Sequence, residues 1–276
     1  MLARILIGGL LLGVAPLLGK AQVIDEYLGD DSRFYAETKQ VNQFMRRFNG
    51  EEDASGKRYY PENPQYRDEE IRRKYLPILF NNRDGNMDNK LKSRFIKEII
   101  NHDYYLDFHG GNWFAEVQTI FRYEGKSQPA TLFMKLEEAP VGSKWIFTHA
   151  WFKPFAESFT ASEEEAEKFL HPLSHELEFM NLRKIMDDPE ALEAYTASNY
   201  QPDYLSILLY AMKNGEASFQ KVTHVRFHFF QVEGWYFALS RFNRDGYNTG
   251  WLISDLVQTN RDEKDLLKKF LYYEQF

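Results

Sequence analysis

The sequence predicts an α+β protein made of two tandem units, each with about three helices packed on a curved antiparallel sheet of three to four strands. In both halves, segments with a helical period precede segments with the alternation of strands. Short sequences also recur in the same order: residues 120–125 (IFRYEG) match residues 229–234 (FFQVEG). Residues 145–148 (WIFT) likewise match residues 251–254 (WLIS). Self-similarity in consistent order indicates an internal repeat; convergence of two aromatic meanders is the alternative.

Three helices are expected at the start of the first unit. Four apolar residues between Val41 and Phe48 share one face of a helix, which predicts a helix over 34–48. A polar loop with several Gly and Pro residues follows at 49–64. The other two helices are expected over 68–80, with a break near Pro77, and over 91–100.

The apolar period then changes from 3.6 to 2, which is typical of strands. Strands are expected at residues 104–109, 113–123, 130–137 and 144–152. Short turns, most of them with glycine, separate them, so the first unit is expected to contain an antiparallel meander.

The second unit repeats this order after a connector at 154–170. In the connector, Ser162 followed by three Glu residues predicts a capping box at the start of a short helix. Helices are then expected at 174–186, 188–195 and 202–214, strands at 222–232, 235–243 and 251–258, and a last helix at 263–270.

The first 21 residues are typical of a secretory signal peptide. Arg4 precedes an apolar stretch at 5–18, and small residues up to Ala21 end the segment. Cleavage after Ala21 predicts an exported protein, periplasmic or extracellular. A membrane anchor is the alternative, but the stretch is short for a span of about 20 residues. The expected parts are a signal peptide at 1–21, a first α+β domain at 22–156 and a second at 157–276, with no membrane span after cleavage.

Composition limits the classes of function. Hydrophobic residues make up 43% of the 276 residues and aromatic residues 16%, enough for a packed core. A net charge of −7 argues against a nucleic-acid-binding surface. The absence of cysteine excludes thiol catalysis, disulfides and thiolate metal sites. The sequence contains no phosphate-binding or dinucleotide-binding glycine motif, and no cofactor is expected.

The order of three helices followed by a meander resembles the nuclear-transport-factor-2-like superfamily, the cystatin-like α+β fold of ketosteroid isomerase and its relatives. The resemblance covers nearly all of the chain after residue 21, as two copies, and concerns layout rather than a motif. It implies a cone-shaped cavity beneath a curved sheet. The superfamily includes isomerases, dehydratases and noncatalytic binding or assembly domains, so the fold does not select a function. No catalytic arrangement of the superfamily maps onto this sequence, which favours a noncatalytic role.

A candidate pocket is predicted on the two strands that carry the matching tryptophan segments. Trp145, His149 and Trp151 are expected on one face of the first strand. Trp251 and Asp255 are expected on the corresponding face of the second, which makes His149 and Asp255 equivalent. A titratable group among apolar neighbours can have a shifted pKa and act as an acid or a base. The alternative is that His149 is a hydrogen-bonded structural residue.

Other polar residues are weaker candidates. Asp107 and His109 are expected on one face of a strand, where the carboxylate would orient the imidazole ring; a turn beside two glycines is the alternative. His224 and His228 share a strand face but would lie about 13 Å apart, too far for a common metal ion. No metal site is therefore expected.

The predicted function is noncatalytic binding of a small ligand or a protein partner by an exported protein. One alternative is a small-molecule isomerase or lyase that uses His149 or Asp255. A second alternative is a structural component of an envelope assembly. An enzyme requires a deep cavity with a buried His–carboxylate pair, and a binding module requires an aromatic-lined cavity without one. An assembly protein would have filled cones and a large exposed apolar patch.

Overall fold

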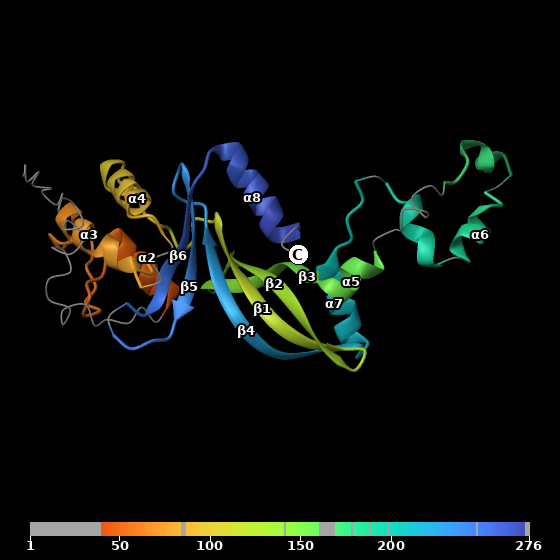
Figure 1. The fold of residues 1–276 in the computed structure, drawn as a ribbon, viewed down its shortest axis with the longest axis horizontal. Coiled ribbons are helices and arrows are strands. Elements are labelled where there is room, and N and C mark those ends of the chain that lie inside the picture. The colour runs from red at the N-terminus through yellow and green to blue at the C-terminus, as the bar shows by residue number, and fades with distance from the viewer. Residues whose placement is uncertain are drawn as a thin grey trace, which may run out of the picture.

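A computed structural model describes residues 40–83, 87–140, 142–159, 169–177, 179–187, 189–197, 199–246 and 248–273. The predicted signal peptide at 1–21, its cleavage site and the predicted capping box at 162–165 lie outside these residues. The described part has an α+β fold, in which helices surround one six-stranded antiparallel sheet (Figure 1). The strand order is β3-β2-β1-β4-β5-β6.

The elements follow one another along the chain, with η marking 3-10 helices. The first helices are α2 (Val41–Asn49), α3 (Glu69–Tyr75), η2 (Leu76–Leu79) and α4 (Asn89–Asn101). The first strands are β1 (Trp113–Tyr123), β2 (Lys126–Ala139) and β3 (Gly142–Phe152). The middle helices are α5 (Lys153–Ser158), η4 (Pro172–Leu177), α6 (Leu182–Met186), η5 (Pro189–Tyr195) and α7 (Tyr204–Lys213). The last elements are β4 (Ala217–Phe229), β5 (Trp235–Phe242), β6 (Gly250–Gln258) and α8 (Arg261–Tyr273).

The apolar face predicted for the first helix is the buried face of α2. Phe44, Met45 and Phe48 lie in the core. The helix ends at Gly50, whose φ of 73° is a left-handed conformation that suits glycine. A Cβ at this position would lie only 2.7 Å from Cγ of Arg72, so the close approach of the next helix also requires glycine.

Aspartate side chains mark the starts of several helices. Asp68 accepts a hydrogen bond from the backbone N–H of Ile71 at the start of α3 (2.9 Å), and Asp203 accepts one from Leu205 at the start of α7 (3.1 Å). The predicted break near Pro77 is confirmed, because α3 passes into η2 there. The single helix predicted over 174–186 is instead two short elements, η4 and α6, and the helix predicted from 188 is the 3-10 helix η5.

The strand predicted over 104–109 is not formed. The backbone N–H and C=O of Leu106 bond to the side-chain amide of Asn49, at 2.8 Å each, rather than to a neighbouring strand. Asp103 and Asn112 on either side have positive φ angles of 50° and 51°, which turn the chain. Leu106 is buried, so the apolar alternation reflects contact with the core without strand pairing. The first meander therefore has three strands instead of four.

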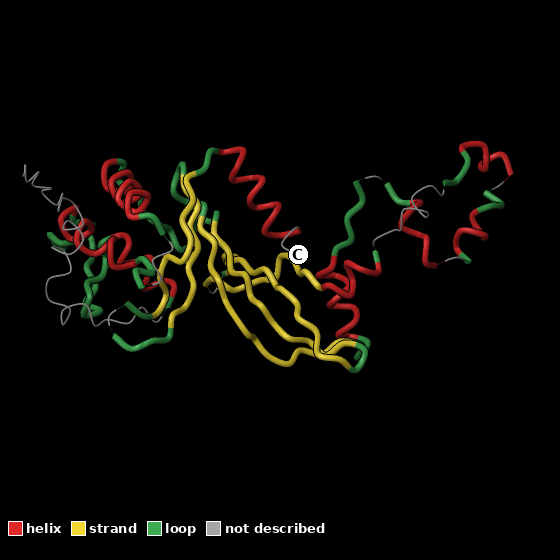
Figure 2. The backbone as a smooth tube through the Cα atoms, in the orientation of Figure 1, coloured by secondary structure: helices red, strands yellow, loops and turns green. Residues whose placement is uncertain are grey.

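One sheet is present where the sequence predicts two. Strands β1 and β4 pair along their whole lengths, from Trp113 opposite Phe229 to Tyr123 opposite Ala217. The meander β1–β3 and the meander β4–β6 thus lie side by side in a continuous, curved sheet (Figure 2). Each meander would otherwise present a long open edge.

Helices from each half of the chain pack on strands from the other half. The ring of Phe95 in α4 lies 5.1 Å from Trp235 and 5.7 Å from Phe237 in β5. The indole N–H of Trp235 also donates a hydrogen bond to Glu98 in α4 (2.6 Å). Conversely, α7 from the second half contacts β3 from the first half. The predicted division at residues 156 and 157 therefore separates segments that share one sheet and one core.

The two faces of the sheet are covered by different helices. Helices α2, α4 and α7 contribute to the main core on one face, called here the α7 face. Helix α8 packs on the opposite face, the α8 face, where Leu271 and Tyr272 meet Phe114 and Phe133. Elements η4, α6 and η5 lie apart from the sheet (Figure 1). Among the described residues, none of the helices combines the length and the apolar character needed to cross a membrane.

Candidate functional site

Strands β3 and β6 each contain one extra residue, and the two lie at matching positions of the repeated tryptophan segments. Phe133 of β2 pairs with His149 and Met134 with Phe147, so Thr148 has no residue opposite it. In the same way, Ser254 falls between the paired residues Ile253 and Asp255 of β6. The two hydroxyls make the same bond: Thr148 donates to the carbonyl of Phe133 (3.2 Å) and Ser254 to that of Ala238 (3.3 Å).

These bulges correct the predicted pocket. In a regular strand, residues an even number of positions apart point to the same face. A bulge between two such residues adds one position to the pattern, so they point to opposite faces instead. Trp145 therefore lies on the α7 face, whereas His149 and Trp151 lie on the α8 face. Trp251 and Asp255 are separated in the same way. The five candidates do not form one pocket, although His149 and Asp255 do share a face.

On the α7 face, the two matching tryptophans meet around one phenylalanine. The ring of Phe227 lies 4.7 Å from Trp251 and 6.1 Å from Trp145, and Trp113 lies 5.5 Å from Trp145. In a flat sheet, β3 and β4 would lie about 14 Å apart, because two strands separate them. The short ring distance shows that the sheet bends towards this face.

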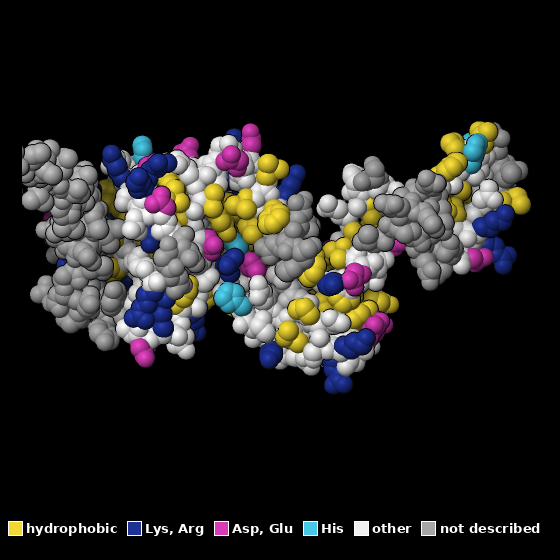
Figure 3. Space-filling view, viewed as in Figure 1, with side chains coloured by type: hydrophobic (Ala, Val, Ile, Leu, Met, Phe, Trp, Pro, Cys, Tyr) yellow, Lys and Arg dark blue, Asp and Glu magenta, His cyan; other side chains and the backbone are white. Residues whose placement is uncertain are grey.

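Beside this cluster, a groove of about 370 Å³ runs between α7 and the sheet. Its lining comes from β1, β2, β3, β4 and α7. The lining residues are Val117, Thr119, Phe121, Leu132, Met134, Phe147, Leu205, Leu208, Leu209, Met212, Phe219 and Val222. Thr119 is the one polar residue among them, and its hydroxyl already donates to the carbonyl of Ala130 (2.7 Å). The surface view shows hydrophobic side chains around α7 and the neighbouring strand ends (Figure 3).

On the α8 face, a hydrogen-bonded chain of polar side chains is buried in the sheet. Nδ1 of His228 lies 2.9 Å from the hydroxyl of Tyr236, and its Nε2 lies 2.8 Å from a carboxylate oxygen of Glu116. All three residues are buried, and the His228 ring stacks on Phe114 at 4.8 Å.

Burial determines the protonation states of His228 and Tyr236. It lowers the pKa of His228, against the opposing effect of the Glu116 carboxylate, and it raises the pKa of Tyr236. His228 is therefore neutral and Tyr236 protonated near neutral pH. The hydroxyl of Tyr236 then donates to Nδ1, and Nε2–H donates to Glu116, so each of these groups has a partner.

Further polar residues extend the chain across the sheet. Gln118 donates to the second carboxylate oxygen of Glu116 (3.2 Å), and Arg226 lies 3.7 Å from Asp255. The bulge residue Ser254 donates to Asp255 at 2.7 Å. The predicted candidate Asp255 thus lies close enough to this network for its charge to raise the pKa of His228, while the ring of His149 stacks on Tyr272 of α8 at 4.4 Å. Burial, with some repulsion from Lys135, lowers the pKa of His149.

The weaker candidates lie in a turn. The carboxylate of Asp107 accepts a hydrogen bond from the backbone N–H of His109 (2.9 Å), and a Cβ on Gly110 would lie 2.8 Å from the Asp107 side chain. Nδ1 of His109 lies 2.9 Å from the Ser143 hydroxyl. Asp107 and His109 are exposed, and this geometry is that of a side chain closing a turn.

Two kinds of site therefore face away from each other: an apolar groove on the α7 face and a buried polar network on the α8 face. Within the described residues, no cluster of three or more His, Asp or Glu side chains is arranged to hold a metal ion. No family model, curated protein or solved structure matches the chain.

Proposed function

We propose that this chain is an exported, noncatalytic binding protein that holds an apolar small molecule in the groove between α7 and the sheet. The observation that carries the proposal is the lining of the groove, which contains no charged side chain. Pockets for small molecules are concave and mostly apolar, and commonly have volumes of about 300–1,000 Å³. The volume of this groove falls within that range.

Large apolar side chains at the groove remain open to solvent. Phe147 is 50% exposed and Phe219 is 49% exposed, although both have aromatic or aliphatic neighbours. Completing the burial of one such ring contributes on the order of 1 kcal/mol to binding. Because Thr119 is already bonded to Ala130, a ligand that fills the groove gains mainly from apolar contact.

The matching architecture of the two halves supports the duplicated layout within this proposal. β1, β2 and β3 correspond to β4, β5 and β6, and the bulge residues Thr148 and Ser254 repeat both position and hydrogen bond. The halves would then be two nuclear-transport-factor-2-like units joined through β1 and β4, as the element order predicts. Export rests on residues 1–21 and can be tested by sequencing the N-terminus of the mature protein.

The enzyme alternative gains one specific observation, the buried pair of Glu116 and His228. This pair lies on the α8 face, whereas the groove lies on the α7 face, so a molecule in the groove does not reach it. Binding therefore accounts for the groove better than catalysis does. In the assembly alternative, the same exposed apolar residues would contact another protein molecule. The experiment below distinguishes such association from ligand binding.

The groove is tested with the neutral apolar fluorophore N-phenyl-1-naphthylamine. We expect saturable binding that Leu209→Asp weakens by about tenfold or more, because a carboxylate in the groove must lose water without gaining a partner. Tyr210→Asp is the matched control: Tyr210 is the next residue of α7, is exposed and does not line the groove. Equal loss of binding in both variants would contradict the proposal. Self-association that Leu209→Asp abolishes, without any probe binding, would favour the assembly alternative.

A further inference from the structure

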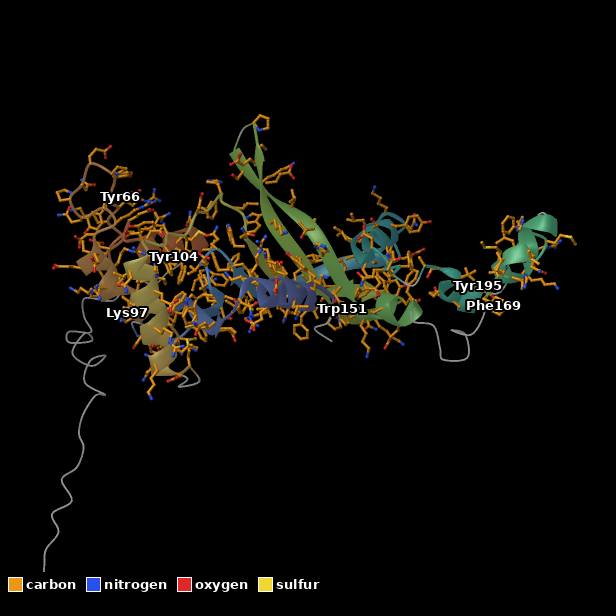
Figure 4. The ribbon with its side chains drawn as sticks, turned by 90° about the horizontal axis from the view of Figure 1, so that it is seen from above. Tyr66, Lys97, Tyr104, Trp151, Phe169 and Tyr195 are labelled. Carbon is orange, nitrogen blue, oxygen red and sulfur yellow. The ribbon has the colours of Figure 1, made fainter. Side chains whose placement is uncertain are left out.

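A second cavity, of about 880 Å³, opens on the α8 face at the end of the sheet next to α5. Three of its lining residues, Gln118, Thr131 and Trp151, lie directly opposite one another on β1, β2 and β3. Side chains opposite each other on adjacent antiparallel strands share a face and lie about 5 Å apart. An indole ring, a hydroxyl and an amide therefore stand in a row across the floor of this cavity. Figure 4 shows Trp151 where β3 runs into α5.

The amide of Gln118 is held in place by the buried network. Its Nε2 donates to Glu116, and the other oxygen of Glu116 is bonded to His228. One N–H and the carbonyl oxygen of Gln118 remain available to a ligand. On the next strand, the hydroxyl of Thr223 donates to the backbone carbonyl of Gln118 (3.1 Å), which leaves its oxygen able to accept. The polar groups of the cavity are thus fixed before a ligand arrives, which lowers the entropic cost of binding.

The lining of the cavity is electrically balanced. Its two charged residues are Lys153 and Glu157, at successive turns of α5. Nζ of Lys153 lies 3.3 Å from a carboxylate oxygen of Glu157, so their charges offset each other. An anionic ligand such as a nucleotide would meet Glu157, and a purely apolar ligand would cover the hydroxyls and the amide without bonding to them. A neutral ligand with an apolar face and several hydroxyls fits these groups better.

We propose that this cavity is a second ligand site that binds a neutral sugar ring. The C–H groups on one face of a pyranose carry partial positive charge and pack on the part of the Trp151 ring that lines the cavity. The ring hydroxyls bond to Gln118, Thr131 and Thr223. Gln118, Thr131 and Trp151 lie on the face opposite the apolar groove, and Thr119 is the one residue that lines both sites.

The test is titration of the purified protein with two neutral trisaccharides, maltotriose and chitotriose, by calorimetry and ligand-detected NMR. At least one is expected to bind with a Kd in the millimolar range or below. Trp151→Ala is expected to weaken binding by about tenfold or more, which corresponds to roughly 1.4 kcal/mol. Trp151→Phe keeps an aromatic ring and is expected to give an intermediate Kd. This variant still tests the role of Trp151 if the alanine variant does not fold.

The matched control is Trp145→Ala, on the same strand but on the opposite face, which is expected to leave sugar binding unchanged. Leu209→Asp in the apolar groove is expected to leave it unchanged as well, so failure of one proposal is distinguishable from failure of the other. The inference is overturned if neither trisaccharide binds at millimolar concentration. It is also overturned if Trp145→Ala weakens binding as much as Trp151→Ala, or if adenosine binds at Trp151 in place of the sugars.

Discussion

Glu116, His228 and Tyr236 show how a carboxyl group is accommodated inside this sheet. A carboxylate buried without partners would cost several kcal/mol, but Glu116 accepts hydrogen bonds from both His228 and Gln118. Arg226 on the same strand lowers the pKa of His228, and Asp255 on β6 raises it. Removing any one member leaves a buried partner unsatisfied, so the network is expected to be sensitive to substitution.

The lowered pKa of His228 predicts that stability falls in acid. In the unfolded chain the imidazole titrates near pH 6.5, whereas the folded state keeps it neutral to lower pH. Below about pH 6.5 the unfolded state therefore binds more protons, and the free energy of unfolding falls by up to about 1.4 kcal/mol per pH unit for one such group. His228→Gln removes this titration, so urea unfolding at several pH values should show a shallower slope.

Tyr236→Phe is the comparison for this prediction. It removes the hydroxyl next to His228 but keeps the titrating ring, so it should lower stability across the pH range while a slope remains. His149, whose pKa burial also lowers, accounts for slope that persists in His228→Gln. Identical slopes for wild type and His228→Gln would show that His228 does not stay neutral in the folded state.

At this scale the sequence indicates some members of the sites and misses others. Asp255 is predicted as a candidate, and it lies beside the polar network, paired with Arg226 and Ser254. Glu116 and Tyr236 are missed, although a glutamate inside the apolar run of residues 113–117 is a signal that a buried partner is present. His228 is considered only as a metal ligand, because strand spacing alone does not show which residue lies on the adjacent strand.

Among the elements, α8 closes the α8 face with one side of its helix. Leu271 is 6% exposed and packs with Phe114 and Phe133, whereas Leu266 of the same helix is 65% exposed. Leu271→Ala is expected to lower the free energy of unfolding by about 2–4 kcal/mol, because it leaves a cavity in a packed cluster. Leu266→Ala should change it by less than about 0.5 kcal/mol. Chemical denaturation of both variants checks this, and equal effects would mean that α8 is not docked as described.

Elements with a long regular pattern are predicted well, and irregular ones are not. The helices at α2, α4 and α7 follow from apolar periodicity, with aspartate caps at α4 and α7. The false strand at 104–109 has the right alternation, but Asn49 takes its backbone hydrogen bonds. Bulges such as those at Thr148 and Ser254 cannot be recognised from a hydrophobic pattern. Each residue after a bulge points to the face opposite the one that regular alternation predicts.

At the scale of the whole molecule, the joining of the two meanders is the feature that the sequence does not reveal. A strand with apolar residues on both faces can pair with any open edge, and local pattern does not say which. Here the central pair is β1 with β4, which come from different halves of the chain. The contact of Phe95 with Trp235 and Phe237 then places a helix of the first half on the sheet of the second.

This arrangement predicts that neither half folds alone. Residues 22–156 would expose the edge of β1 and the helix faces that pack on β5, and residues 157–276 would lose the helices that cover Trp235 and Phe237. Expressed separately, each half should lack a cooperative thermal transition by circular dichroism, whereas the full chain should show a single one. Mixing the two halves should restore a transition, because the missing contacts lie between them. A cooperative transition in either isolated half would mean that this half is an independent domain that merely lies edge to edge with the other.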